Sequence, residues 1–145
     1  MGRKSPNGKS MPSATSARPA ENSRSVLAVT MGDPCGIGPE VVLGAVSDRR
    51  VVEAANVVVV GDEQRLRATA KELKKRWPFA AVHKEVPARP RGSKPQLYDL
   101  GNVDRELLAG QVSARAGKAA GEFVERAVAL VSKRCADALV TAPIH

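Results

Sequence analysis

Four consecutive valines, Val57 to Val60, constrain the fold of this 145-residue chain more than any other stretch. Valine is β-branched and favours strands. A strand without alternating polar residues is buried on both faces, and such strands occur in parallel sheets covered by helices. The run that begins at Asn56 therefore predicts a central strand over 56–60 of an α/β protein.

Other segments show the periodicity of strands or helices in alternating order. In chain order we expect a strand over 26–30, a helix over 39–47, a helix over 63–76 with Asp62 as its N-cap, a strand over 80–86, a helix over 113–135 with Ser113 as its N-cap, and a strand over 138–141. Residues 87–101 are rich in proline and glycine and indicate a loop or an irregular arm, in which a short extended segment at Leu97, Tyr98 and Leu100 is one alternative; we predict only a connection. This order predicts a doubly wound parallel sheet with helices on both faces.

A glycine-rich turn follows the first strand. Gly32, Gly36 and Gly38 interrupt the chain, and Pro39 fits the first position of a helix. The unpaired N–H groups at such a helix start suit an anionic ligand. Alternatively, the turn is only a tight connection that needs glycine for its geometry. Its spacing gives neither G-x-G-x-x-G nor a Walker A loop.

Ligands of open α/β sheets bind beyond the carboxyl ends of the strands. The glycine turn and the segment 141–145 both occupy such ends. If their strands are neighbours, the two segments converge on one crevice. The residues expected to line it, for a substrate or a cofactor, are Asp33, Gly36, Gly38, Thr141 and His145. The alternative is that these residues have no ligand: Asp33 caps the turn, Thr141 packs in the sheet, and His145 belongs to a frayed terminus.

Composition narrows the class of protein. Half of the formal net charge of +8 lies in residues 1–24, which are rich in Ser, Pro and Gly and predict a disordered basic leader. Aromatic residues make up 3% of the chain, which argues against nucleic-acid binding. No apolar run approaches the roughly 20 residues that span a bilayer, so no membrane partner is expected. Two cysteines without a secretory signal indicate a cytoplasmic protein.

Three stretches resemble one known family. MGDPCGIGPEVV (31–42), GQVSARAGKAAGEFVERAVAL (110–130) and DALVTAPIH (137–145) are similar, in this order, to the N-terminal portion of the 4-hydroxythreonine-4-phosphate dehydrogenase family of vitamin B6 biosynthesis. That family typically has alanine where this chain has Cys35. Its members are more than twice as long as this chain.

The resemblance implies a fold of the isocitrate/isopropylmalate dehydrogenase type and an oxidation of 4-phosphooxy-threonine (4-hydroxythreonine 4-phosphate) by NAD or NADP. It also implies a homodimer, a phosphorylated small-molecule substrate and a divalent metal (Zn, Mg or Co) held by histidines later in the family's sequence. No such role transfers to His83 or His145. We therefore expect no metal ligands here, no assignable catalytic residue, and a truncated dehydrogenase domain over 25–145 that is inactive alone.

Three alternatives remain open at this stage. The first is a dehydrogenase for a related phosphorylated four-carbon sugar acid, because such relatives share the signature. The second is a non-catalytic fragment that holds a phosphate or serves as an interaction module. The third is a basic nucleic-acid binder, whose affinity would depend steeply on salt and on residues 1–24.

Overall fold

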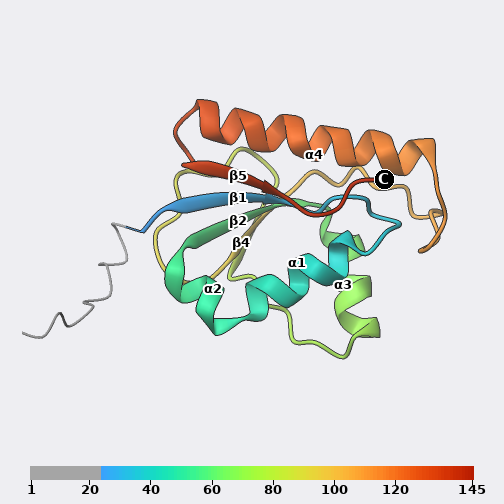
Figure 1. Cartoon of the computed structure of the whole chain (residues 1–145), viewed down its shortest axis with the longest axis horizontal. Helices are drawn as coiled ribbons and strands as arrows, with labels where there is room; N and C mark the ends of the chain where they lie inside the picture. The colour runs from blue at the N-terminus through green and yellow to red at the C-terminus, as the bar shows by residue number, and fades with distance from the viewer. Residues whose placement is uncertain (1–23) are drawn as a thin grey trace, which may run out of the picture.

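A computed structural model describes residues 24–145 (Figure 1). The expected disordered leader therefore lies outside the described residues, except for Arg24. The structure contains one sheet whose strands are all parallel, in the order β3-β4-β2-β1-β5. The strands are β1 (Val26–Thr30), β2 (Asn56–Gly61), β3 (Ala81–His83), β4 (Gln96–Asp99) and β5 (Ala138–Thr141).

Helices cover both faces of this sheet. They are α1 (Gly38–Ser47), α2 (Arg49–Ala54), α3 (Glu63–Glu72) and α4 (Ala114–Ser132). Figure 1 shows α4 along one face and the other three helices on the opposite face. This arrangement confirms the predicted doubly wound α/β architecture. None of the helices in the described part of the chain is long and apolar enough to cross a membrane.

The valine run forms the centre of the core, as its sequence predicts. All six residues of β2 are buried, and β2 pairs with β1 on one side and β4 on the other. Leu43 of α1 and Leu66 of α3 are fully buried on one face of the sheet, and Phe123 of α4 is fully buried on the other. With so few aromatic residues, this core is built mainly from aliphatic side chains.

The stretch 87–101 corrects one expectation. Instead of only a connection, it contains β4, which lies inside the sheet between β3 and β2. Leu97 is fully buried and Tyr98 is 6% exposed, as expected for a strand that has a paired strand on each side. The strand is four residues long and follows Pro95, so the surrounding Pro and Gly residues obscured its apolar pattern.

Several boundaries also differ from the sequence prediction. Helix α3 ends at Glu72 rather than at residue 76, because Lys74 adopts a left-handed conformation (φ 53°) and the N–H of Lys75 turns back to the Ala70 carbonyl. Helix α4 ends at Ser132, and Arg134 (φ 59°) makes the corresponding turn. The strand expected over 80–86 covers only Ala81–His83.

Of the two predicted N-caps, one makes a side-chain capping bond and the other does not. The Asp62 carboxylate caps α3 by accepting a hydrogen bond from the N–H of Arg65 at 2.9 Å. Ser113 occupies the N-cap position of α4, but its side chain makes no capping bond. Val128, an apolar residue in the middle of that helix, is 48% exposed. Helix α2 was not predicted, since none of its residues is buried and it carries no apolar pattern.

Candidate functional site

The candidate site lies where the connections of the sheet change direction. From β1 the chain passes through α1 and α2 to β2, whereas β5 follows α4 and pairs with the other edge of β1. In open α/β sheets such a switch point forms a ligand crevice at the carboxyl ends of the strands. These ends lie together on the right of Figure 1, beside the C-terminus.

The turn after β1 and the segment after β5 meet at this point. The N–H of Asp33 donates to the Pro143 carbonyl at 3.0 Å, and the N–H of Ala142 donates to the Thr30 carbonyl at 3.2 Å. The two strands are direct neighbours, with Thr30 opposite Thr141. The glycine turn and the segment after β5 therefore converge, because the strands that precede them are neighbours.

Glycine is required at two positions of the turn. Gly32 has a φ of +73°, and a Cβ there would lie 2.4 Å from the Pro143 carbonyl oxygen. A Cβ at Gly38 would lie 2.2 Å from the Met31 carbonyl oxygen. Both positions allow backbone to approach backbone, so the tight-connection interpretation is correct for them. Gly36, by contrast, is exposed and meets only the Asp33 side chain, at 3.4 Å.

Asp33 closes the turn from inside. Its side chain is buried, and its Oδ1 accepts a hydrogen bond from the Cys35 N–H at 2.8 Å. The Asp33 carbonyl accepts a second bond, from the Gly36 N–H at 3.1 Å. This carboxylate therefore caps the turn, as the structural alternative expected. Its predicted contact with a ligand remains a prediction.

The start of α1 offers free backbone donors beside this turn. Ile37 is the N-cap, no side chain caps the helix, and Pro39 follows at the second helical position. Within residues 24–145, the N–H groups of Ile37, Gly38 and Glu40 make no hydrogen bond. Free N–H groups at a helix N-terminus attract anions, through hydrogen bonding and the positive end of the helix dipole.

The two predicted residues after β5 have fewer contacts. Thr141 and His145 are both exposed, and no hydrogen bond joins either to the glycine turn. The structure places Thr141 in register with the end of β1 but assigns no partner to His145. The other histidine, His83, bonds to the Gln96 side chain at 2.9 Å, as expected for a structural residue. Among residues 24–145, no three His, Cys, Asp or Glu side chains form a metal-binding group.

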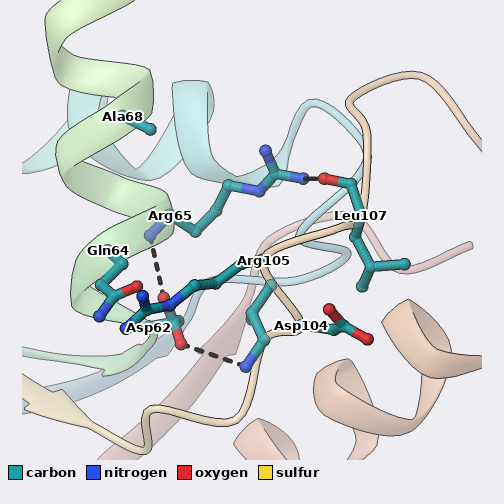
Figure 2. A pocket seen from close by; sticks show the side chains of 8 residues that line it. Asp62, Gln64, Arg65, Ala68, Asp104, Arg105 and Leu107 are labelled. Carbon is teal, nitrogen blue, oxygen red and sulfur yellow. Dashed lines mark hydrogen bonds between the residues drawn. The ribbon is translucent and has the colours of Figure 1, made fainter.

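Sequence reasoning missed a cavity at the end of β2. Its volume is about 190 Å³, and it lies between α3 and the loop that precedes α4 (Figure 2). Its lining residues are Asp62, Gln64, Arg65, Ala68, Val103, Asp104, Arg105 and Leu107. Two arginines and two aspartates make the cavity mixed in charge, and Ala68, Val103 and Leu107 give it an apolar part.

Arg65 connects this cavity to the glycine turn. Its Nη2 donates to the Leu107 carbonyl at 3.0 Å and lies 3.8 Å from the Cys35 sulfur. The N–H of Gly110 donates to the Cys35 carbonyl at 2.6 Å. Cys35 thus lies between the turn and the loop 100–110. The sequence indicated only that Arg65 is the third residue of a helix, so these distant partners gave no local signal.

Two buried carboxylates fix the same loop. Asp62 accepts a hydrogen bond from the Val103 N–H at 3.1 Å, in addition to capping α3. Asp99 accepts bonds from the N–H groups of Glu63 (2.9 Å) and Gly101 (3.0 Å). Asp99 also pairs with the Lys84 ammonium, and this hydrogen bond raises the pKa of Lys84 above its ordinary value. The carboxyl ends of β2 and β4 are therefore held rigidly.

Known proteins resemble this chain over most of its length. A D-threonate 4-phosphate dehydrogenase from Cupriavidus necator is 35% identical over 120 residues, which cover 83% of this chain and 36% of the relative. The solved structure of a 4-hydroxythreonine-4-phosphate dehydrogenase from Burkholderia phymatum matches with a TM-score of 0.75 and 30% identity, over 86% of this chain and 38% of that one. The corresponding Klebsiella pneumoniae enzyme matches with a TM-score of 0.73 and 30% identity, over 85% and 38%.

This chain therefore spans little more than a third of the length of these relatives. Residues 53–145, well over half of the chain, match the protein family described as pyridoxal phosphate biosynthetic protein PdxA. The likeness to these solved structures agrees with the parallel α/β fold. The chain belongs to the PdxA family.

Proposed function

We propose that this chain is the N-terminal part of a dehydrogenase that oxidises a phosphorylated hydroxy acid with a nicotinamide cofactor. Two substrates are consistent with the names of its relatives: 4-phosphooxy-threonine (4-hydroxythreonine 4-phosphate) and D-threonate 4-phosphate. The second is a phosphorylated four-carbon sugar acid, the class that the sequence analysis kept as its alternative.

The observation that carries this proposal is the meeting of the glycine turn with the segment after β5. The free N–H groups of Gly38 and Glu40 lie at the start of α1, next to the contact between Asp33 and Pro143. We propose that these N–H groups bind a phosphate or carboxylate group of the substrate. We propose that Thr141, at the end of β5, and His145, four residues after it, supply further polar groups to the same ligand, since both are exposed.

The proposal includes a nicotinamide cofactor and a divalent metal, but it assigns no residue of this chain to either. In a complete enzyme, NAD or NADP would accept the hydride and a divalent ion would polarise the substrate hydroxyl. The described residues contain neither a metal-binding group nor the dinucleotide fingerprint, so they do not fit either group. We assign them substrate binding and no step of the hydride transfer. A homodimer in the cytoplasm is part of the same proposal.

A steady-state assay tests the proposal. The 145-residue chain is incubated with NAD or NADP, with Zn²⁺, Mg²⁺ or Co²⁺, and with each substrate in turn, while reduced cofactor is followed by absorbance. We expect no turnover, because the described residues supply no metal ligands. Turnover by these residues alone would contradict the assignment.

The nucleotide sequence after the His145 codon provides the matching positive test. An in-frame continuation with a His-Thr pair and further histidines would supply the missing ligands, and the longer product should then oxidise one of the two substrates. The ratio of its kcat/KM values for the two would select between them. A stop codon, together with anion binding and no turnover, would favour the non-catalytic phosphate-binding fragment instead.

A further inference from the structure

The connection between β4 and α4 carries exposed apolar side chains that the proposed function does not use. This connection, residues 100–113, contains no helix or strand, and connections of more than about 12 residues without regular structure often have a function. Its first residues are held by Asp62 and Asp99. The remainder, residues 105–112, is exposed at every position except Leu107, which is half-buried; we call it the strap.

Two hydrogen bonds tie the strap to the candidate site. The Leu107 carbonyl accepts a bond from Nη2 of Arg65 at 3.0 Å, and Figure 2 shows the arginine side chain reaching across to it from α3. The N–H of Gly110 donates to the Cys35 carbonyl at 2.6 Å. The strap therefore lies beside the glycine turn.

Little else in residues 24–145 holds the strap in place. Glu106 forms an ion pair with Arg115 of α4 across 4.0 Å, and an ion pair between two exposed side chains contributes little to stability. The remaining hydrogen bonds of the strap go to Asp104, next to it in the sequence. A segment with few buried contacts rearranges at a small fraction of the free energy of global unfolding. The strap can therefore move while the sheet and its helices stay folded.

The three most exposed large apolar side chains of residues 24–145 lie within two residues of the hydrogen bond between Cys35 and Gly110. Ile37, two residues after Cys35, is 58% exposed. Leu108 (60%) and Val112 (76%) lie two residues before and two residues after Gly110. Single exposed apolar residues are common, but a cluster of them marks a surface that binds or covers something. Because Ile37 is the N-cap of α1, this cluster borders the free N–H groups at the start of that helix.

We propose that the strap closes over an anion bound at the start of α1, and that Leu108 and Val112 then pack onto Ile37. This inference rests on the proposed function, which places a phosphate or carboxylate group there. Closure buries the three apolar side chains together and excludes water from the bound anion, which strengthens the anion's hydrogen bonds. The bonds from Arg65 and to Cys35 keep the open strap next to the turn, so closure needs only a short movement.

The test uses the 145-residue chain with labelled backbone amides and methyl groups, and 4-phosphooxy-threonine as the probe. Nuclear magnetic resonance follows binding through the amide shifts of Gly38 and Glu40. Closure is followed through nuclear Overhauser effects between the methyl groups of Ile37 and those of Leu108 or Val112. Hydrogen exchange of the strap amides provides a second measure of closure.

A pair of serine variants separates closure from a general change of the surface. Leu108→Ser removes an apolar side chain from the strap. The matched control, Val86→Ser, also replaces an exposed apolar side chain by serine, but it lies in the connection between β3 and β4. Both side chains are exposed, so neither change should disturb the fold.

We expect the probe to shift the Gly38 and Glu40 signals, to strengthen the methyl contacts with Ile37, and to slow exchange of the strap amides by about tenfold or more. Leu108→Ser should weaken probe binding about threefold to tenfold, because part of a leucine side chain is no longer buried on closure. Val86→Ser should change it by less than about twofold.

Each other result has a distinct meaning. Shifts of Gly38 and Glu40 without stronger methyl contacts or slower exchange would overturn closure and leave the proposed function standing. The absence of these shifts in the unchanged chain would contradict the proposed function, and with it the ligand that the strap covers. Equal weakening by both serine variants would also overturn closure. Methyl contacts between differently labelled chains that grow with protein concentration would assign the apolar cluster to an interface between copies instead.

Discussion

Replacing Gly38 with alanine should destabilise the protein, whereas the same change at Gly44 in the same helix should not. A Cβ at Gly44 would meet no atom within 4 Å. A Cβ at Gly38 would lie 2.2 Å from the Met31 carbonyl oxygen and 3.3 Å from the Asp33 carbonyl oxygen. These neighbours are backbone atoms, so no side-chain rotation can relieve the contact.

The magnitudes follow from these contacts. Alanine at Gly44 should gain about 0.5–1 kcal/mol, because glycine is the weaker helix former. Alanine at Gly38 requires the turn to move by about 1 Å, and overpacking of this kind typically costs about 1–3 kcal/mol. The two variants should therefore differ by about 1.5–4 kcal/mol in the free energy of unfolding.

Urea denaturation of both variants and the unchanged chain, followed by circular dichroism, measures this difference. Gly44→Ala serves as the control, because both substitutions lie in α1 and add the same methyl group. Equal stability of Gly38→Ala and the unchanged chain would show that backbone contact does not determine the turn. Destabilisation by Gly44→Ala would contradict the open space found beside that residue.

Two further predictions concern polar contacts that hold the strand ends. Arg65→Met keeps the aliphatic stem but removes the bonds to the Leu107 carbonyl and the Cys35 sulfur, and should cost about 1–2 kcal/mol. Amide hydrogen exchange should then accelerate in residues 102–110 before the rest of the chain; uniform acceleration would argue against a local role. The hydrogen bonds from Arg89 and from the Val26 N–H lower the pKa of Asp137. The stability this carboxylate supplies is therefore present above its unfolded pKa of about 3.9 and is lost as pH falls through the lower folded value. Asp137→Asn should be less stable at neutral pH and should show a smaller loss on acidification, measured by thermal melts from pH 7 to about 2. An unchanged pH profile would contradict the assigned pairing.

Much of the sheet could be predicted because its strands carry strong local signals. The valine run of β2 is buried throughout, and β1 alternates between buried and half-buried residues, so the hydrophobicity that identifies these two strands also buries them. The apolar residues of β5 identify that strand as well, although most of it is exposed. In contrast, β4 is short, and its burial comes from pairing with strands distant in sequence. The end of α3 also escaped prediction, because a lysine rather than a glycine adopts the left-handed conformation there.

In the candidate site, too, features with a local sequence signal could be predicted, whereas contacts between distant residues could not. The glycine turn and its position at a helix start were visible in the sequence. The pairing of β1 with β5 brings this turn next to the segment 141–145, as expected if the two strands are neighbours. The use of Asp33 within the turn was an open alternative that only the contact with Cys35 resolves. Arg65 was missed because its partner Leu107 lies 42 positions away, where no local pattern could connect them.

We propose that the ends of β1 and β5 together bind a phosphorylated hydroxy acid. The most direct test is a titration of the 15N-labelled chain with 4-phosphooxy-threonine, with threonine as the unphosphorylated control. We predict weak, saturable shifts of the Gly38, Glu40 and Thr141 amide signals, and none for Gly44, with the phosphorylated ligand only. Shifts of equal size with threonine, or shifts confined to residues away from this crevice, would contradict the claim.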